Sequence, residues 1–249
     1  MEQSREACMG QTIEQSIDEA PEGRRAGQAD EGAQEVLLVQ ASPHALGTTS
    51  ALVRTLAGSL VPSCRVRILD LSSLHMEGCT HCGRCRRPPF SCVLAKEDAC
   101  EAVFAALRAA KAVVWISPVY FYGLPARAKA LVDRSQRFFV HPQKLPHPAP
   151  RVLTVFVAGR PRGAQLFTGS HLALKYFCQS LGLNLVCACG LRGLETDTDV
   201  TPSVQAEAVR ALARVFPDLV PAGAQAPCGQ ADLVCQPGFS HLDILWSTL

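Results

Sequence analysis

The chain has 249 residues, 48% of them hydrophobic, which is long and apolar enough to bury a sizeable core as one domain with appendages. The net charge is +2, but residues 1–34 hold eight acidic residues against three arginines (−5), which leaves +7 for the rest. No basic stripe is interleaved with aromatic residues and no run of about eighteen apolar residues occurs, which argues against a nucleic-acid partner and against membrane insertion.

The two ends of the chain differ in composition from its middle. Residues 1–34 are rich in Glu, Gln, Gly and Ala and would bury too little surface to offset the entropy of ordering, so we expect a flexible acidic leader. The leader lacks the pattern of a secretory signal, and we expect a cytoplasmic protein whose twelve cysteines are reduced. Proline and glycine interrupt residues 218–249, which are predicted to form an irregular C-terminal tail.

Short apolar strands alternate with helical segments in residues 35–217, the predicted domain. We expect strands at 35–41, 65–70, 112–117, 151–158 and 184–189, and helices at 49–60, from about 97, and at 124–139, 164–181 and 204–216. Residues 35–41 and 112–117 are continuous apolar runs, typical of strands buried on both faces, whereas 65–70 alternates like an edge strand. This order predicts an α/β fold with an open parallel sheet and right-handed crossovers.

The loop after the first strand, 42–49, has residue types that suit a phosphate group. Ligands of open parallel sheets bind beyond the carboxyl ends of the strands. Gly47 would let backbone amides approach a ligand, and the next helix would present unpaired N–H groups. Hydroxyl groups are offered by Ser42, Thr48 and Thr49. An ordinary strand-to-helix turn could have the same composition, and the loop has neither a Walker A motif nor the three-glycine dinucleotide fingerprint.

Two further loops would end at the same edge of the sheet. Residues 117–123 include two tyrosines and a phenylalanine that could cover a flat ring, with the backbone around Gly123 free to bind heteroatoms. The alternative is that these aromatic residues cap the core. Residues 158–164 contain Arg160 and Arg162, which could hold an anionic phosphate or the 2′-phosphate of a nicotinamide cofactor, or could remain solvated at the surface.

A cysteine-rich insertion at 75–95 carries the spacing Cys-x2-Cys-x2-Cys-x6-Cys. Four thiolates this close together suit a [4Fe–4S] cluster, and they also suit a tetrahedral zinc ion. A loop of reduced thiols without a metal is the third interpretation. His81 lies among the cysteines but is not needed as a ligand. The predicted metal ligands are Cys79, Cys82, Cys85 and Cys92.

Together, these motifs resemble the flavodoxin-like NADPH-dependent FMN reductase family, and within it the iron–sulfur flavoproteins. The resemblance spans residues 36–216, and the combination of motifs is more specific than any one of them. Its motifs, in the family's order, are Ser42-Pro43-His44, Gly47-Thr48-Thr49, the cysteine run, Glu97-Asp98, Ser117-Pro118-Val119-Tyr120-Phe121 and Lys129-Ala130-Leu131-Val132-Asp133-Arg134.

The resemblance implies a doubly wound, five-stranded parallel sheet in the order 2-1-3-4-5, with helices on both faces and FMN at the strand edge. The FMN phosphate would be held by Ser42, His44, Gly47, Thr48 and Thr49. The flavin ring would be flanked by Pro118, Val119, Tyr120, Phe121 and Tyr122, and the predicted cofactor site also includes Gly123 and Gly159. A homodimer or homotetramer is implied as well.

We therefore expect an FMN-dependent NAD(P)H oxidoreductase that passes electrons to a small acceptor or a redox protein, with a [4Fe–4S] cluster as a candidate second carrier. The flavin carries the chemistry, so no catalytic side chain is predicted. A cluster-free quinone, nitro or azo reductase is an alternative on the same scaffold. A non-enzymatic redox sensor and a zinc-stapled interaction protein without flavin are alternatives of different classes.

Overall fold

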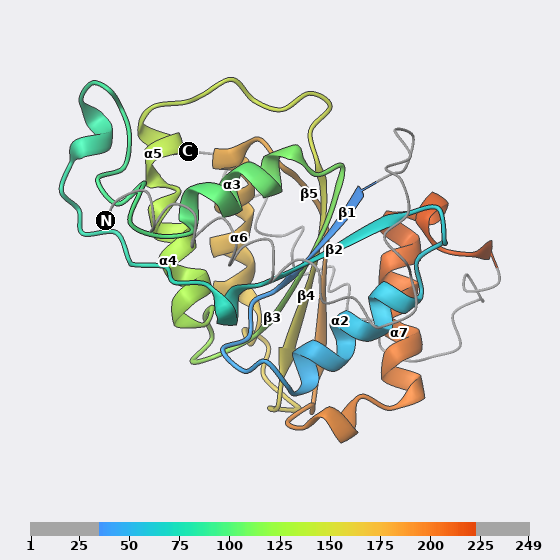
Figure 1. Cartoon of the computed structure of the whole chain (residues 1–249). Helices are drawn as coiled ribbons and strands as arrows, with labels where there is room; N and C mark the ends of the chain where they lie inside the picture. The colour runs from blue at the N-terminus through green and yellow to red at the C-terminus, as the bar shows by residue number, and fades with distance from the viewer. Residues whose placement is uncertain (1–34, 223–249) are drawn as a thin grey trace, which may run out of the picture.

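The computed structural model describes residues 35–222, which form a five-stranded parallel sheet with a layer of helices on each face (Figure 1). The strand order is β2-β1-β3-β4-β5, and every neighbouring pair is parallel. This confirms the predicted flavodoxin-like architecture and its strand order. The strands are β1 (Glu35–Gln40), β2 (Arg65–Asp70), β3 (Ala112–Pro118), β4 (Arg151–Ala158) and β5 (Asn184–Arg192).

The helices divide between the two faces of the sheet because each presents its apolar side to it. On one face lie α2 (Thr48–Gly58) and α7 (Pro202–Val215) (Figure 1). The other face is covered by α3 (Cys100–Ala109), α4 (Ala126–Arg134), α5 (Gln136–Val140) and α6 (Thr168–Leu181). Short 3-10 turns lie at Leu71–Ser73 (η1), Arg84–Arg86 (η2), Asp197–Asp199 (η3) and Pro217–Leu219 (η4).

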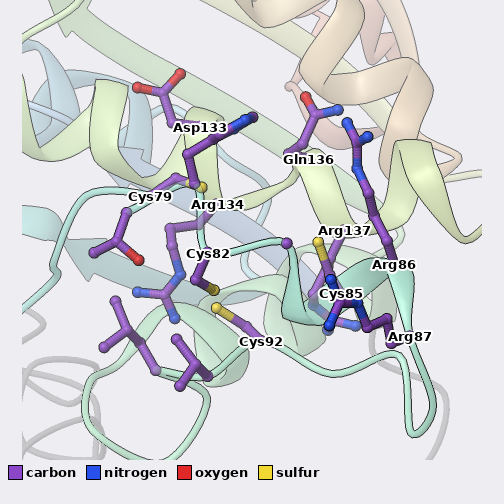
Figure 2. Close-up of a pocket in the computed structure, with 15 residues that line it drawn as sticks. Cys79, Cys82, Cys85, Arg86, Arg87, Cys92, Asp133, Arg134, Gln136 and Arg137 are labelled. Atoms are coloured by element: carbon purple, nitrogen blue, oxygen red, sulfur yellow. The ribbon is translucent and has the colours of Figure 1, made fainter.

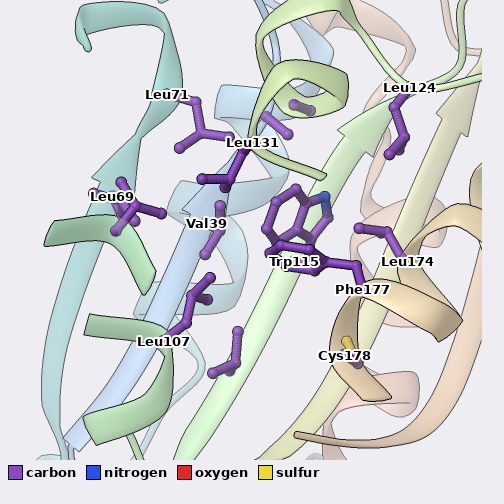
Figure 3. Close-up of a cluster of buried hydrophobic side chains, with 14 of the residues drawn as sticks. Val39, Leu69, Leu71, Leu107, Trp115, Leu124, Leu131, Leu174, Phe177 and Cys178 are labelled. Carbon is purple, nitrogen blue, oxygen red and sulfur yellow. The ribbon is translucent and has the colours of Figure 1, made fainter. Parts of the chain in front are cut away.

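The central strands form the middle of the core. Almost every side chain of β1 and β3 is buried, which explains their continuous apolar sequences, whereas edge strand β2 is only partly buried. Trp115 of β3 packs against Phe177 of α6 in an edge-on arrangement, with ring centroids 5.7 Å apart (Figure 3). Full burial of a large apolar side chain such as Phe177 contributes roughly 1.5–3 kcal/mol, so this layer fixes α6 on the sheet.

Some element boundaries differ from the sequence-based expectation. The helix predicted at 124–139 is two helices, α4 and α5, that meet at Ser135. The Ser135 hydroxyl donates to the carbonyl of Val132 at 2.7 Å, and such local bonds bend helices. The helix expected from about residue 97 begins at Cys100, and the Asp98 carboxylate forms a turn before it by accepting a hydrogen bond from the Cys100 N–H at 3.0 Å.

The predicted leader (1–34) and most of the predicted tail (218–249) lie outside the described residues. The domain limits at 35 and 217 therefore stay a prediction. Within residues 35–222, no helix has the length and apolar character needed to cross a membrane.

Candidate functional site

The loops that follow β1, β3 and β4 lie at one edge of the sheet. The three strands are neighbours and parallel, so their carboxyl ends coincide. Backbone hydrogen bonds continue the pairing past the strand ends: the Ala41 N–H donates to the Ile116 carbonyl at 2.8 Å, and the Val119 N–H donates to the Val157 carbonyl at 2.9 Å. The loop residues predicted to bind a cofactor are thereby brought to the same edge.

The loop between β1 and α2 leaves the start of the helix open. The Ser42 hydroxyl accepts a hydrogen bond from the His44 N–H at 3.1 Å, which folds the loop into a tight turn. Gly47 precedes α2 with a φ of 141°, and no atom lies within 4 Å of where its Cβ would be. No side chain caps α2 and its first turn has no acidic residue, so the positive end of the helix dipole is left for an external anion.

The side chains of this loop differ in their exposure. His44 is exposed and is free to approach a ligand from outside. Thr48 and Thr49 are buried, at 8% and 3% exposure, so their backbone N–H groups contribute to the helix end more directly than their hydroxyls do. The Ser50 hydroxyl bonds back to the Gly47 carbonyl at 2.9 Å. The loop therefore offers a bound anion mainly backbone donors.

The loop after β3 is a strained turn that displays an aromatic ring. Tyr120 and Gly123 exchange two backbone hydrogen bonds, at 3.0 and 2.9 Å. The two residues between them, Phe121 and Tyr122, have positive φ angles of 49° and 63°, which bulky residues rarely adopt. The Phe121 side chain is fully exposed, at 105%. The expectation of a free backbone at Gly123 is wrong, because its N–H and carbonyl are both bonded to Tyr120.

The loop after β4 contacts this aromatic turn. The Arg160 guanidinium donates a hydrogen bond to the Tyr122 hydroxyl at 2.6 Å, so one predicted surface arginine is engaged within the site. Predicted cofactor residue Gly159 packs closely on Glu195, whose Cγ would lie 2.6 Å from an added Cβ. Because the exposed Glu195 side chain could move aside, this contact alone does not require glycine at this position.

The close contact between Gly169 and Tyr122 at this edge was not predicted from the sequence. Gly169, in the first turn of α6, faces the Tyr122 carbonyl oxygen, which would lie 2.3 Å from an added Cβ. Only glycine permits this approach between α6 and the aromatic turn. The single glycine inside an otherwise helical pattern was the available signal.

These features fit a phosphorylated, planar cofactor such as FMN. In the described part of the chain, the start of α2 has no capping side chain, and the ring of Phe121 is covered by no neighbour. A phosphate can bind at the uncapped start of α2, and a flat conjugated ring can stack on the exposed Phe121 ring. Both lie at the edge where open parallel sheets bind their ligands.

The cysteine segment lies apart from this edge, beside α4 and α5 (Figure 1). It lines a cavity of about 590 Å³ together with the last turn of α4 and the start of α5. Figure 2 shows the sulfur atoms of Cys82 and Cys92 pointing toward one another, while those of Cys79 and Cys85 lie apart from them. The cavity thus gathers all four predicted metal ligands on its wall without bringing their sulfur atoms to one point.

This arrangement does not support the predicted [4Fe–4S] cluster or its zinc alternative. Among residues 35–222, no group of three or more His, Cys, Asp or Glu side chains is placed to hold a metal ion. Four thiolates around one centre are required for either metal. The side chains as they lie do not fit such a group.

A buried ion pair holds the two ends of the cysteine segment on α4. Arg134 Nη1 donates to Asp98 Oδ2 at 2.6 Å, and both side chains are at most 1% exposed. Asp98 Oδ2 also accepts from the Glu77 N–H at 2.9 Å. Burial alone would raise the pKa of Asp98, but the N–H of Glu77, the Arg134 guanidinium and the N–H of Cys100 lower it further than burial raises it. This ion pair joins two of the motifs that carry the family resemblance, Glu97-Asp98 and the segment that ends in Asp133-Arg134.

The thiols of this region have different chemical character. The pKa of Cys82 is lowered because the backbone N–H of Arg84 donates a hydrogen bond to it, with smaller effects of Thr80 and of the Arg134 charge. Burial raises the pKa of Cys100 to about 12, so this thiol is an inert part of the core. Cys82 is exposed and Cys92 is half-buried.

The strand order defines a flavodoxin-like protein, and the edge formed by the β1, β3 and β4 loops is its candidate cofactor edge. The chain belongs to the NADPH-dependent FMN reductase family, whose model matches residues 35–169. This makes the protein an FMN oxidoreductase, with NAD(P)H as the electron donor. No curated protein is similar enough to the chain to count as a match.

Solved structures support the fold. A FMN-dependent NADH-azoreductase from Bacillus anthracis, solved in complex with FMN, is 13% identical, with a TM-score of 0.53 over 73% of this chain and 99% of that one. The protein Smu.1420 from Streptococcus mutans is 16% identical, with a TM-score of 0.52 over 75% of this chain and 100% of that one. At such identities the similarity shows a shared fold.

Proposed function

We propose that the protein binds FMN at the edge formed by the β1, β3 and β4 loops and uses it to reduce a small, electron-poor acceptor such as a quinone, nitro or azo compound. The observation that carries this proposal is the pairing of an uncapped helix start at Gly47 with a fully exposed ring at Phe121 on one sheet edge. The family membership supplies the cofactor and the electron donor.

The residues of the edge have separate roles in this proposal. The backbone N–H groups around Gly47, Thr48 and Thr49 would hold the phosphate, with Ser42 and His44 completing the loop around it. The segment from Pro118 to Gly123 would flank the ring. FMN bound there would supply hydride acceptance from NAD(P)H and electron transfer to the acceptor, which is the cofactor's own chemistry.

The protein's contribution is to position the ring and its partners. Arg160 fixes the Tyr122 hydroxyl through its hydrogen bond of 2.6 Å, and Gly169 lets α6 support the Tyr122 backbone from below. A flavin held beside Phe121 would supply the redox chemistry for the nicotinamide donor and for a flat, electron-poor acceptor.

The electron path of this proposal contains no metal cluster. The iron–sulfur branch of the family would need the four thiols of the cysteine segment at one centre, and their arrangement in residues 35–222 does not support it. The structure thus favours the cluster-free alternative among the two reductase functions. The azoreductase activity of the Bacillus anthracis protein is consistent with this choice of acceptor class.

The assembly state remains a prediction. Phe121 and Leu46 are both strongly exposed at the cofactor edge, at 105% and 79%. Exposed apolar side chains beside a ligand edge agree with the expectation that a second subunit of a homodimer or homotetramer approaches the site.

The test is a titration of the purified full-length protein with FMN, followed by assays of NADPH and NADH oxidation with a quinone, a nitro compound and an azo dye. We expect a yellow protein with bound FMN that, in the absence of oxygen, oxidises the nicotinamide catalytically only when an acceptor is supplied. A protein that binds no FMN would overturn the proposed site. Bound FMN without acceptor reduction would leave the site and refute the proposed acceptors.

A further inference from the structure

The cavity beside α4 and α5 carries more positive charge than its ion pairs neutralise. Four arginines line it, and two of them have acidic partners: Arg134 pairs with Asp98, and Arg137 pairs with Glu101. The acidic lining residue Asp133 is itself paired with Lys129 at 2.6 Å.

The surplus falls on Arg86 and Arg87, which are exposed and form no ion pair with an acidic side chain in the described part of the chain. Both arginines line the same cavity as the cysteines. The cavity is therefore suited to a small anionic molecule.

The backbone around Cys82 is held in an uncommon conformation. His81 on one side and Gly83 on the other have positive φ angles of 54° and 70°. A positive φ in a residue such as His81 costs free energy and persists only where the surroundings impose it, which is a feature of functional loops. The Cys82 thiol between these two residues is exposed.

The other arm of the segment is fixed by different contacts. The Phe90 ring stacks on His141, with centroids 4.0 Å apart and planes inclined by 7°. The Asp98–Arg134 pair anchors the end of the segment, and Arg134 lies close enough to both Cys82 and Cys92 to interact with each electrostatically. The segment is thus ordered by protein contacts alone, and the Cys82 and Cys92 side chains, which both line the cavity, point toward one another (Figure 2).

We infer that this cavity is a thiol–disulfide exchange site for a small anionic disulfide, with Cys82 and Cys92 as the reacting pair. The exposed Cys82 sulfur attacks one sulfur of the bound disulfide, forming a mixed disulfide and releasing one thiol of the ligand. The Cys92 sulfur then attacks Cys82 in that mixed disulfide, forming the Cys82–Cys92 bond and releasing the second thiol. The pair loses two electrons and two protons, and the ligand disulfide gains both.

Each part of the cavity has a role in this reaction. Arg86 and Arg87 attract the carboxylates of the ligand, and the anchored arms hold the two sulfur atoms pointing toward one another. Cys79 and Cys85 line the cavity but lie apart from the pair, so they serve as matched controls on the same segment. This inference is independent of FMN binding and of the proposed acceptors.

The test treats the reduced full-length protein with oxidised glutathione, an anionic disulfide, and follows the products by intact-mass and peptide mass spectrometry. We expect loss of two hydrogen masses and a cross-linked peptide pair that contains Cys82 and Cys92. Cys92→Ser should instead accumulate one glutathionyl group on Cys82, because the second step is blocked. Cys79→Ser and Cys85→Ser should still form the cross-link.

Charge recognition is tested by the double variant Arg86→Ala/Arg87→Ala. Its reaction with oxidised glutathione should slow about tenfold at low salt, the lower end of the effect of charged clefts on association. Its reaction with the neutral disulfide of 2-mercaptoethanol should keep the wild-type rate. Equal slowing with both disulfides would refute the anion site.

Two further outcomes would overturn the inference as a whole. One is equal modification of all four cysteines of the segment without a preferred cross-link. The other is iron bound stoichiometrically as a cluster in protein purified without oxygen, since the thiols would then be ligands. Both measurements are made on wild-type protein, so neither depends on a variant folding correctly.

Discussion

The candidate cofactor edge and the cysteine segment differ in how their groups are partnered. At the cofactor edge, the start of α2 is uncapped and the Phe121 ring is fully exposed, so groups are left for a ligand. In the cysteine segment, a buried ion pair and a stacked ring pair hold the chain, so its order depends on no ligand. Variants that remove a ligand group at the cofactor edge should therefore weaken FMN binding, whereas variants that break a contact anchoring the cysteine segment should lower stability.

The largest change in the free energy of unfolding is expected from Asp98→Ala. Removing the carboxylate leaves Arg134 charged and buried, and breaking such a pair costs about 3–5 kcal/mol of unfolding free energy. Urea unfolding of the purified variant measures this loss. The control is the exposed pair Lys129–Asp133 on α4, the helix that carries Arg134. Asp133→Ala should cost less than about 1 kcal/mol of unfolding free energy. Equal losses in the two variants would contradict the role of burial.

The same pair predicts a pH dependence of stability. The pKa of Asp98 is lowered in the folded protein, so the carboxylate stabilises the fold above its unfolded pKa of about 3.9. This contribution is lost as the pH falls through the lower folded pKa. The difference in unfolding free energy between wild type and Asp98→Asn should be constant above about pH 5 and should shrink below about pH 4. A difference that grows on acidification would show that another group is responsible.

The next effect is expected at the cofactor edge, from Gly47→Val. A β-branched residue is strained at the φ of 141°, and its side chain would occupy the open space before α2. Strain of about 1–3 kcal/mol and a blocked anion approach should weaken FMN binding by about tenfold or more. Fluorescence titration with FMN measures the change.

The matched control for this change is at the other end of the same helix. Gly58, the last residue of α2, also has open space around an added Cβ but needs no positive φ. Gly58→Val should therefore keep FMN affinity unchanged. Unchanged affinity in Gly47→Val as well would remove the β1 loop from the phosphate site.

The sequence predicted the fold well because its signals are local and redundant. The continuous apolar runs in β1 and β3 follow from their central positions, and the alternation in β2 follows from its edge position. The bend at Ser135 was missed, because a hydroxyl bonding to its own helix leaves the apolar pattern unchanged. Secondary structure was therefore predictable to within a few residues at most boundaries.

The sites were less predictable because their geometry depends on contacts distant in sequence. The cysteine spacing predicted a shared location and one cavity holds all four, but spacing cannot specify where each sulfur atom points. The Asp98–Arg134 pair joins residues 36 positions apart, and no local pattern indicates it. The turn at Phe121 and Tyr122 adopts angles that favour Asn and Gly, so its residue types concealed its shape.

The smallest effects are expected from Phe121→Asn, which should change both the stability of the protein and its affinity for FMN. Asn tolerates the positive φ of 49° better than Phe does, so the ligand-free protein should gain about 1 kcal/mol of unfolding free energy. Loss of the exposed ring should weaken FMN binding by about 0.5–1.5 kcal/mol, the usual contribution of ring stacking. Thermal unfolding with and without FMN measures both effects in one experiment. A gain in stability with unchanged FMN affinity would mean that the strain at Phe121 serves contacts other than those with the flavin.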